Sequence, residues 1–126
     1  MGKLSKYSVF LLIFFHLLIT IPLAYVLNAW VDEASTLFNT EHGLIHTFEN
    51  VFHTEKQAPL YFLVLSLWRD IDGSIFFARI FSIICSCLAI KVFYDLSKTF
   101  LRENQAVFLT AFFALHPFLI WISLEI

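Results

Sequence analysis

The sequence predicts an all-α membrane protein with three transmembrane helices and two juxtamembrane amphipathic helices in its first external loop. Hydrophobic residues make up 60% of the 126 residues and charged residues only 14%, whereas a soluble domain has about 25% charged residues. The charges stand in short interruptions between apolar runs, each near the roughly 20 residues that cross a bilayer. No basic tract suited to nucleic acid is present. We therefore expect the lipid bilayer as a partner and no nucleic acid.

The three predicted spans cover about residues 8–27, 75–94 and 106–124. The first follows a short basic N-terminus but is longer than the apolar core of a cleaved signal peptide, which has about 7–15 residues. We therefore expect it to stay in the protein as a membrane anchor. All of residues 1–126 then belong to one transmembrane domain, with residues 28–74 as a long loop after the first span.

Two juxtamembrane helices are expected inside the loop of residues 28–74. One shows an apolar stripe at helical spacing with polar residues on the other face, as in a helix that lies on a membrane surface. Its apolar positions are Leu44, Ile45, Phe48, Val51 and Phe52. The other is the apolar run of residues 60–68, which as a helix would reach only about 14 Å and is too short to cross.

Basic residues orient the predicted spans. Lys3 and Lys6 precede the first span, and Lys98 and Arg102 lie between the second and the third. Because Lys and Arg favour the cytoplasmic side, the N-terminus is predicted to be cytoplasmic and the loop of residues 28–74 external.

Asp32 and Glu33 form an acidic pair where the first span leaves the bilayer. Carboxylates near hydrocarbon need water, a cation or a basic partner. Asp32 could simply cap a following helix or be solvated, or it could act as a general base or cation ligand at the mouth of a membrane cavity. Glu125, at the end of the third span, is a further ionisable candidate on the same side.

Glu55, Lys56 and Arg79 could bind a ligand or have a purely structural role. Glu55 could coordinate a divalent cation, and Lys56 could hold a phosphate group; the pair could equally be an ordinary exposed turn. Arg79 could snorkel to the external interface or approach the acidic loop as a counter-ion. Cys85 and Cys87 point to different faces of a helix, so we expect buried, unreactive thiols rather than a disulfide.

Four motifs follow one another along the chain: WVDEA at residues 30–34, EKQAPLYF at 55–62, SIFFARIFS at 74–82 and HPFLIWISLE at 116–125. In this order and spacing they resemble the N-terminal part of the GT-C membrane glycosyltransferases, in particular the protein-mannosyltransferase-like family 39. The second motif departs mildly from the family pattern, because Gln-Ala-Pro stands where the family has a Pro-Pro pair.

The resemblance implies a function and a set of roles. It implies transfer of a sugar from a polyprenyl-phosphate donor to an external acceptor, in the plasma membrane of a prokaryote. Asp32 would be the catalytic base, with Glu33 assisting. Glu55 would help to bind a divalent metal cation, and Lys56, Arg79 and Glu125 would bind substrate or its phosphate.

The family builds its donor cavity from many more spans than three. We therefore expect this chain to be an N-terminal fragment of such an enzyme, inactive alone. The alternative is a small, non-enzymatic three-span protein that acts as an assembly partner or as a piece of a transporter.

Overall fold

The computed structural model describes residues 2–41, 43–52 and 59–126. They form helices only, in the order α1 (Gly2–Val26), α2 (Val31–Asn39), α3 (Leu44–Asn50), α4 (Pro59–Arg69), α5 (Ile75–Phe100), α6 (Glu103–Ala114) and α7 (Pro117–Ile122). The all-α prediction is therefore confirmed for the described part of the chain.

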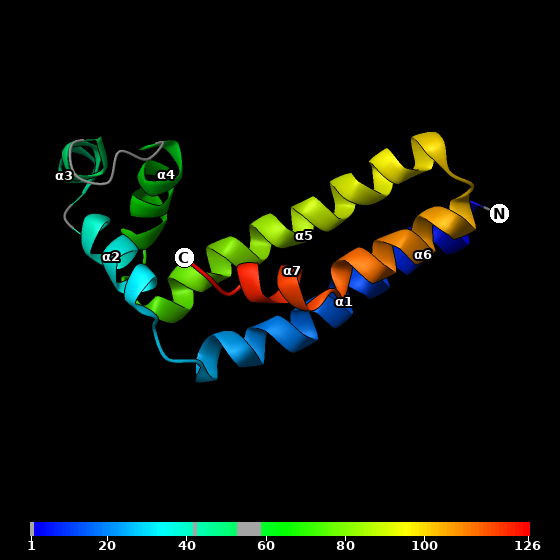
Figure 1. Ribbon diagram of the computed structural model, residues 1–126, viewed down its shortest axis with the longest axis horizontal. Coiled ribbons are helices and arrows are strands. Elements are labelled where there is room, and N and C mark those ends of the chain that lie inside the picture. Colours follow the sequence, from blue (N-terminus) through cyan, green and yellow to red (C-terminus); the bar gives the residue numbers. More distant parts are fainter. Residues whose placement is uncertain (1, 42, 53–58) are drawn as a thin grey trace.

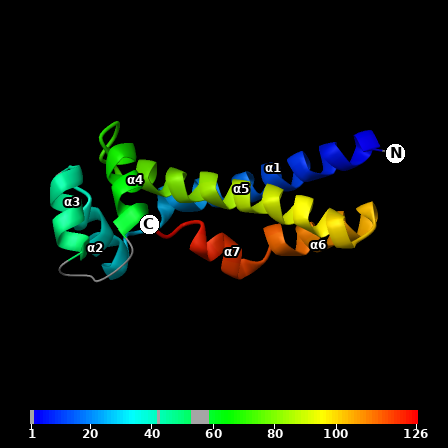
Figure 2. The same cartoon turned by 90° about the horizontal axis from the view of Figure 1, so that it is seen from above.

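The long helices α1, α5 and α6 contact one another and form an elongated bundle (Figure 1). The turn between α5 and α6 lies at the same end as the N-terminus, and α2, α3 and α4 gather at the opposite end in both views (Figure 2). α3 runs across the long axis of the bundle. The basic residues near the N-terminus and those near the α5–α6 turn thus belong to one end, and the loop of residues 28–74 belongs to the other.

Two helices are long and apolar enough to cross a membrane, over Tyr7–Val26 and Ile75–Phe100. Only 22% and 28% of the residues in their most apolar windows are buried, which a core helix of a soluble protein would not show. These helices match the predicted first and second spans, and they favour a membrane protein.

Many buried side chains inside the bundle are small or hydroxylated, beside larger ones such as Ile83 and Tyr94, whereas many large apolar side chains lie on its outside. Small side chains let helix backbones approach closely, as they do in membrane proteins. The buried ones include Thr20, Ala24, Ala78, Ser86, Ala106, Thr110 and Ala114, whereas Phe10, Phe14, Phe108 and Phe112 are exposed.

The predicted third span is not one continuous helix. Residues 103–122 form α6 and α7, separated by a break at Leu115 and His116. The break has a physical cause, because Pro117 has no backbone N–H to donate to the preceding turn. His116 begins the new helix, and its Nδ1 accepts a hydrogen bond from the Phe118 N–H at 3.2 Å.

A buried histidine of α1 satisfies a carbonyl group that this break leaves without a helical partner. The carbonyl oxygen of Ala114 has lost its helical partner, and Nδ1 of His16 donates to it at 2.9 Å. The other ring nitrogen, Nε2, lies 2.9 Å from the Ser86 hydroxyl of α5. His16 is fully buried, so one side chain ties together α1, α5 and the α6–α7 break.

The loop of residues 28–74 holds three helices in its described part, where the sequence predicts two. α3 and α4 lie at the predicted places, and α2 is additional. The predicted apolar stripe faces outward except at Val51, which is buried, because Leu44, Ile45, Phe48 and Phe52 are exposed. On the other side of α3, Thr47 is buried. Thr47 donates to the Ser66 hydroxyl of α4 at 3.3 Å, so α3 packs on α4 through small side chains and its large apolar residues face outward.

The prediction that both thiols are buried is wrong. Cys85 is exposed and Cys87 is half-buried. Cys85 is exposed on α5 beside a cavity, whereas Cys87 packs beside Ala24 and Ile83. The expectation that they form no disulfide is confirmed, because both cysteines are free.

Candidate functional site

The predicted catalytic pair lies in the first turn of α2, directly after the end of α1. Glu33 caps this helix, because its Oε2 accepts a hydrogen bond from the Trp30 N–H at 3.0 Å. A carboxylate is also favoured near a helix N-terminus by the helix dipole. Capping of α2 is therefore performed by Glu33, not by Asp32.

Glu33 forms a buried ion pair with Arg79 of α5. Nε of Arg79 donates to Oε1 at 3.0 Å, and Nη2 donates to Oε2 at 2.7 Å. Both side chains are 2% exposed. This two-point geometry is the strong form of an arginine–carboxylate contact. Of the two alternatives for Arg79, the structure shows the counter-ion and not the snorkelling side chain.

The remaining N–H groups of Arg79 hold the end of α1. Nη1 donates to the carbonyl oxygens of Ala24 at 2.9 Å and Leu27 at 2.7 Å, and Nη2 donates to that of Asn28 at 3.0 Å. The five N–H groups of the guanidinium are thereby all used inside the protein. Arg79, predicted to bind phosphate, has no donor left for a ligand in this arrangement and instead fixes the link between α1 and α2.

Asp32 has a different environment from its neighbour. Its side chain is exposed and lines a cavity of about 180 Å³, together with the buried Glu33 and with Trp30, Trp121, Glu125 and Ile126. The described residues contain ion pairs only between Arg79 and Glu33 and between Lys91 and Asp95. Within the described part of the chain, the carboxylates of Asp32 and Glu125 therefore have no cationic side chain as partner.

The three tryptophans of the chain lie at this end of the molecule. Trp30 and Trp121 are in contact, with ring centroids 5.5 Å apart, and Nε1 of Trp121 donates to Glu125. Trp68 stacks on Phe77 at 4.7 Å and donates to the Phe77 carbonyl oxygen at 2.8 Å. Trp30 and Trp121 therefore lie together beside Asp32.

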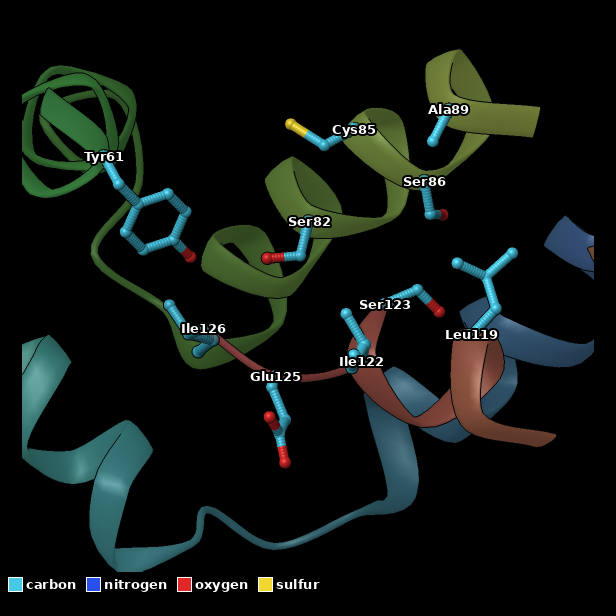
Figure 3. Close-up of a pocket in the computed structure, with 10 residues that line it drawn as sticks. All are labelled: Tyr61, Ser82, Cys85, Ser86, Ala89, Leu119, Ile122, Ser123, Glu125 and Ile126. Carbon is cyan, nitrogen blue, oxygen red and sulfur yellow. The ribbon is translucent and has the colours of Figure 1, made fainter. Parts of the chain in front are cut away.

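A second and larger cavity, of about 440 Å³, lies between α4, α5, α7 and the last residues (Figure 3). Ten residues line it: Tyr61, Ser82, Cys85, Ser86, Ala89, Leu119, Ile122, Ser123, Glu125 and Ile126. Glu125 and Ile126 also line the cavity of Asp32. The two cavities therefore adjoin at the end of the chain.

Tyr61 is the ionisable group of α4 that faces the larger cavity, and its hydroxyl points toward Ser82 (Figure 3). Burial raises the pKa of Tyr61, a hydrogen bond with Ser82 partly opposes this rise, and the nearby Cys85 and Glu33 raise the pKa further. Tyr61 therefore stays a neutral hydroxyl at physiological pH, able to donate or accept a hydrogen bond.

The other predicted site residues, Glu55 and Lys56, lie outside the described residues. Within the described part, no group of three or more histidine, cysteine, aspartate or glutamate side chains could hold a metal ion. The metal role of Glu55 and the phosphate role of Lys56 stay predictions.

The sequence did not indicate that Trp30 and Trp121 lie together beside Asp32, or that Ser82 faces Tyr61. Trp30 and Trp121 stood in the quoted motifs without a role, and Ser82 carried no signal of its own. Their grouping depends on the path of α7 past α5, which no short-range pattern contains.

In comparisons with known proteins, no family model, no curated protein and no solved structure matches this chain. The glycosyltransferase resemblance therefore stays a prediction that rests on the four motifs.

Proposed function

We propose that this chain forms the N-terminal, acceptor-side part of a membrane glycosyltransferase that uses a polyprenyl-phosphate sugar donor, with Asp32 as general base. The observation that carries the proposal is the contrast between two adjacent carboxylates. Glu33 is buried and neutralised by Arg79, whereas Asp32 is exposed at a cavity without a cationic partner. Adjacent acids in such different environments are typical of acids with separate roles.

In the proposed reaction, a carboxylate oxygen of Asp32 takes the proton of an acceptor hydroxyl. The acceptor oxygen then forms a bond to the anomeric carbon of the sugar, and the bond from that carbon to the phosphate oxygen breaks. The polyprenyl phosphate leaves with the electron pair of that bond. Lys56, together with a divalent cation held by Glu55, would stabilise the negative charge on the departing phosphate.

Glu33 and Arg79 receive positioning roles in this proposal. Arg79 donates to the Leu27 carbonyl oxygen, and Glu33 accepts from the Trp30 N–H and from Arg79. Together they fix the backbone between α1 and α2, directly before Asp32. A fixed backbone before Asp32 holds the carboxylate in one place, which general base catalysis requires.

The proposed topology uses α6 and α7 together as a third crossing. They follow one another along the bundle from the end with the N-terminus to the end with α2 (Figure 1). A cytoplasmic N-terminus then places Lys98 and Arg102 in the cytoplasm and Asp32 outside, in the plasma membrane of a prokaryote. α3 and α4 would lie along the outer surface of that membrane.

The test is the substitution Asp32→Asn in the complete product of the reading frame. Sugar transfer from a polyprenyl-phosphate donor should fall by about 10²–10⁴-fold, the contribution typical of a general base. The matched control is Asp70→Asn, because Asp70 is also exposed at this end of the molecule but lines neither cavity. Transfer that persists in the Asp32 variant would contradict the role of Asp32 as general base, whereas absence of transfer by the parent protein would favour the non-enzymatic alternative.

A further inference from the structure

The two adjoining cavities differ in character. The larger cavity has mostly apolar walls between α4, α5 and α7, and the smaller one has three acidic side chains and two indole rings. Of the three, Glu33 is paired with Arg79, and Asp32 and Glu125 are not. We propose that together they bind a membrane amphiphile whose apolar tail lies in the larger cavity and whose positively charged ammonium head lies between Asp32 and Glu125.

The larger cavity suits a hydrocarbon tail. Its volume of about 440 Å³ is in the range of small-molecule sites, roughly 300–1,000 Å³. Cys85 and Ala89 are exposed on the outer side of α5, so the proposed bilayer reaches the wall of the cavity at this point. The hydroxyl groups on its wall have partners inside the protein: Ser86 contacts Ile83 and His16, Ser123 donates to the Ile120 carbonyl oxygen, and Tyr61 bonds with Ser82. The rest of the wall is apolar and suits an apolar tail.

The smaller cavity suits a cation. No lysine or arginine lines either cavity among the described residues. Arg79 lines a small neighbouring cavity with Trp30, Trp121 and Glu125, but its charge is neutralised by Glu33. Two uncompensated carboxylates would attract an ammonium group and repel a phosphate. The exposed rings of Trp30 and Trp121 add faces that attract cations.

Glu125 and Ile126 join the two parts of the proposed site, because both residues line both cavities. One molecule can therefore reach from the apolar walls to Asp32. On the proposed function, on which this part of the inference rests, that molecule is the acceptor, a lipid with an amine close to its reacting hydroxyl. The binding itself does not depend on sugar transfer.

Cys85 provides a direct reporter, since it lines the larger cavity (Figure 3). In a Cys87→Ser background, the rate of Cys85 alkylation by N-ethylmaleimide is measured with the protein in lipid nanodiscs. Dodecylamine, dodecanol and dodecyl phosphate share one tail and differ in the head group. Dodecylamine, charged at neutral pH, should slow alkylation at about tenfold lower concentration than dodecyl phosphate.

Cys87 is the matched control, because it lines neither cavity. In a Cys85→Ser background, dodecylamine should leave alkylation of Cys87 unchanged. Asp32→Asn combined with Glu125→Gln should remove the preference for dodecylamine, and Ala89→Phe should remove protection by filling the cavity. A melting temperature equal to that of the parent protein verifies that each variant is folded.

Three outcomes would overturn the inference. Absence of protection by all three amphiphiles would exclude a tail site in the cavity. Equal or stronger protection by dodecyl phosphate would contradict the ammonium head group, and equal protection of Cys87 would mean a general effect on the membrane. Protection by dodecylamine together with full sugar transfer by the Asp32→Asn variant would keep the binding site and reject the proposed function.

Discussion

Arg79 and Arg69 each hold the C-terminal end of a helix that lies on another part of the chain. Arg79 donates to carbonyl oxygens at the end of α1, and Arg69 donates to the Leu37 carbonyl oxygen near the end of α2 at 2.6 Å. Cations are favoured at such ends by the helix dipole. Both arginines thus donate to carbonyl oxygens at a helix end, Arg79 just before α2 and Arg69 near the end of α2.

The two arginines differ in what compensates their charge. Arg79 is buried and paired with Glu33. Arg69 is half-buried and donates to neutral acceptors, namely the Leu37 carbonyl, the Thr40 hydroxyl and the Gly73 carbonyl, while its Nε has no partner. No carboxylate pairs with Arg69 among the described residues. The start of α2 is therefore held more strongly than its end.

Glu33→Leu should have the largest effect on stability. It leaves the Arg79 charge buried without its partner, which typically costs about 3–5 kcal/mol. The free energy of unfolding is measured by denaturant titration in mixed micelles. Asp32→Asn is the matched control, because the neighbouring carboxylate is exposed and its loss should change stability little. Equal losses for the two variants would contradict the role of the ion pair.

Arg69→Leu should have a smaller effect, about 1–2 kcal/mol, because it removes charge-assisted hydrogen bonds at a half-buried site where water can replace them. Arg102→Leu is the control, since Arg102 is exposed. A loss for Arg69→Leu as large as for Glu33→Leu would abolish the difference between the two arginines.

The smallest expected effect is a pH dependence of stability that comes from Tyr61 of α4, the helix that also carries Arg69. The pKa of Tyr61 is raised mainly by burial, so the folded protein resists its ionisation more than the unfolded chain does. This contribution to stability is fully present below the ordinary tyrosine pKa, about 10, and is lost as the pH rises through the higher pKa of the folded state. The melting temperature should therefore fall less steeply with alkaline pH in Tyr61→Phe than in the parent protein. Identical slopes would contradict the raised pKa.

The sequence contained enough to predict the helices that depend on hydrophobic length and periodicity. α1 and α5 match long apolar runs, and α3 and α4 match a stripe and a short run. α2 is absent from the prediction because it is short, at nine residues, although Val31, Ala34 and Phe38 stand at helical spacing. Glu33 and the two arginines hold it in place. The break at Pro117 was missed because the apolar run continues through it.

The sequence indicated several residues of the candidate site, but it did not predict that Glu33 pairs with Arg79. The acidic pair after the first span and Arg79 were both identified, and the counter-ion role was one of two alternatives for Arg79. The pairing with Glu33 joins positions 46 residues apart, and only the packing of α5 beside the end of α1 brings them together. The cavity shared by Asp32 and Glu125 likewise depends on how α7 ends.

The hydrogen bond from His16 to Ala114 also bears on how the chain enters a membrane during synthesis. In lipid no water is available to satisfy the carbonyl group that the break at Pro117 leaves free. On the proposed topology, α6 and α7 would enter the bilayer at low cost only where α1 already offers the His16 imidazole to this carbonyl group. The order of helices along the chain meets this requirement, because α1 emerges from the ribosome first and α5 reaches it before α6 is made.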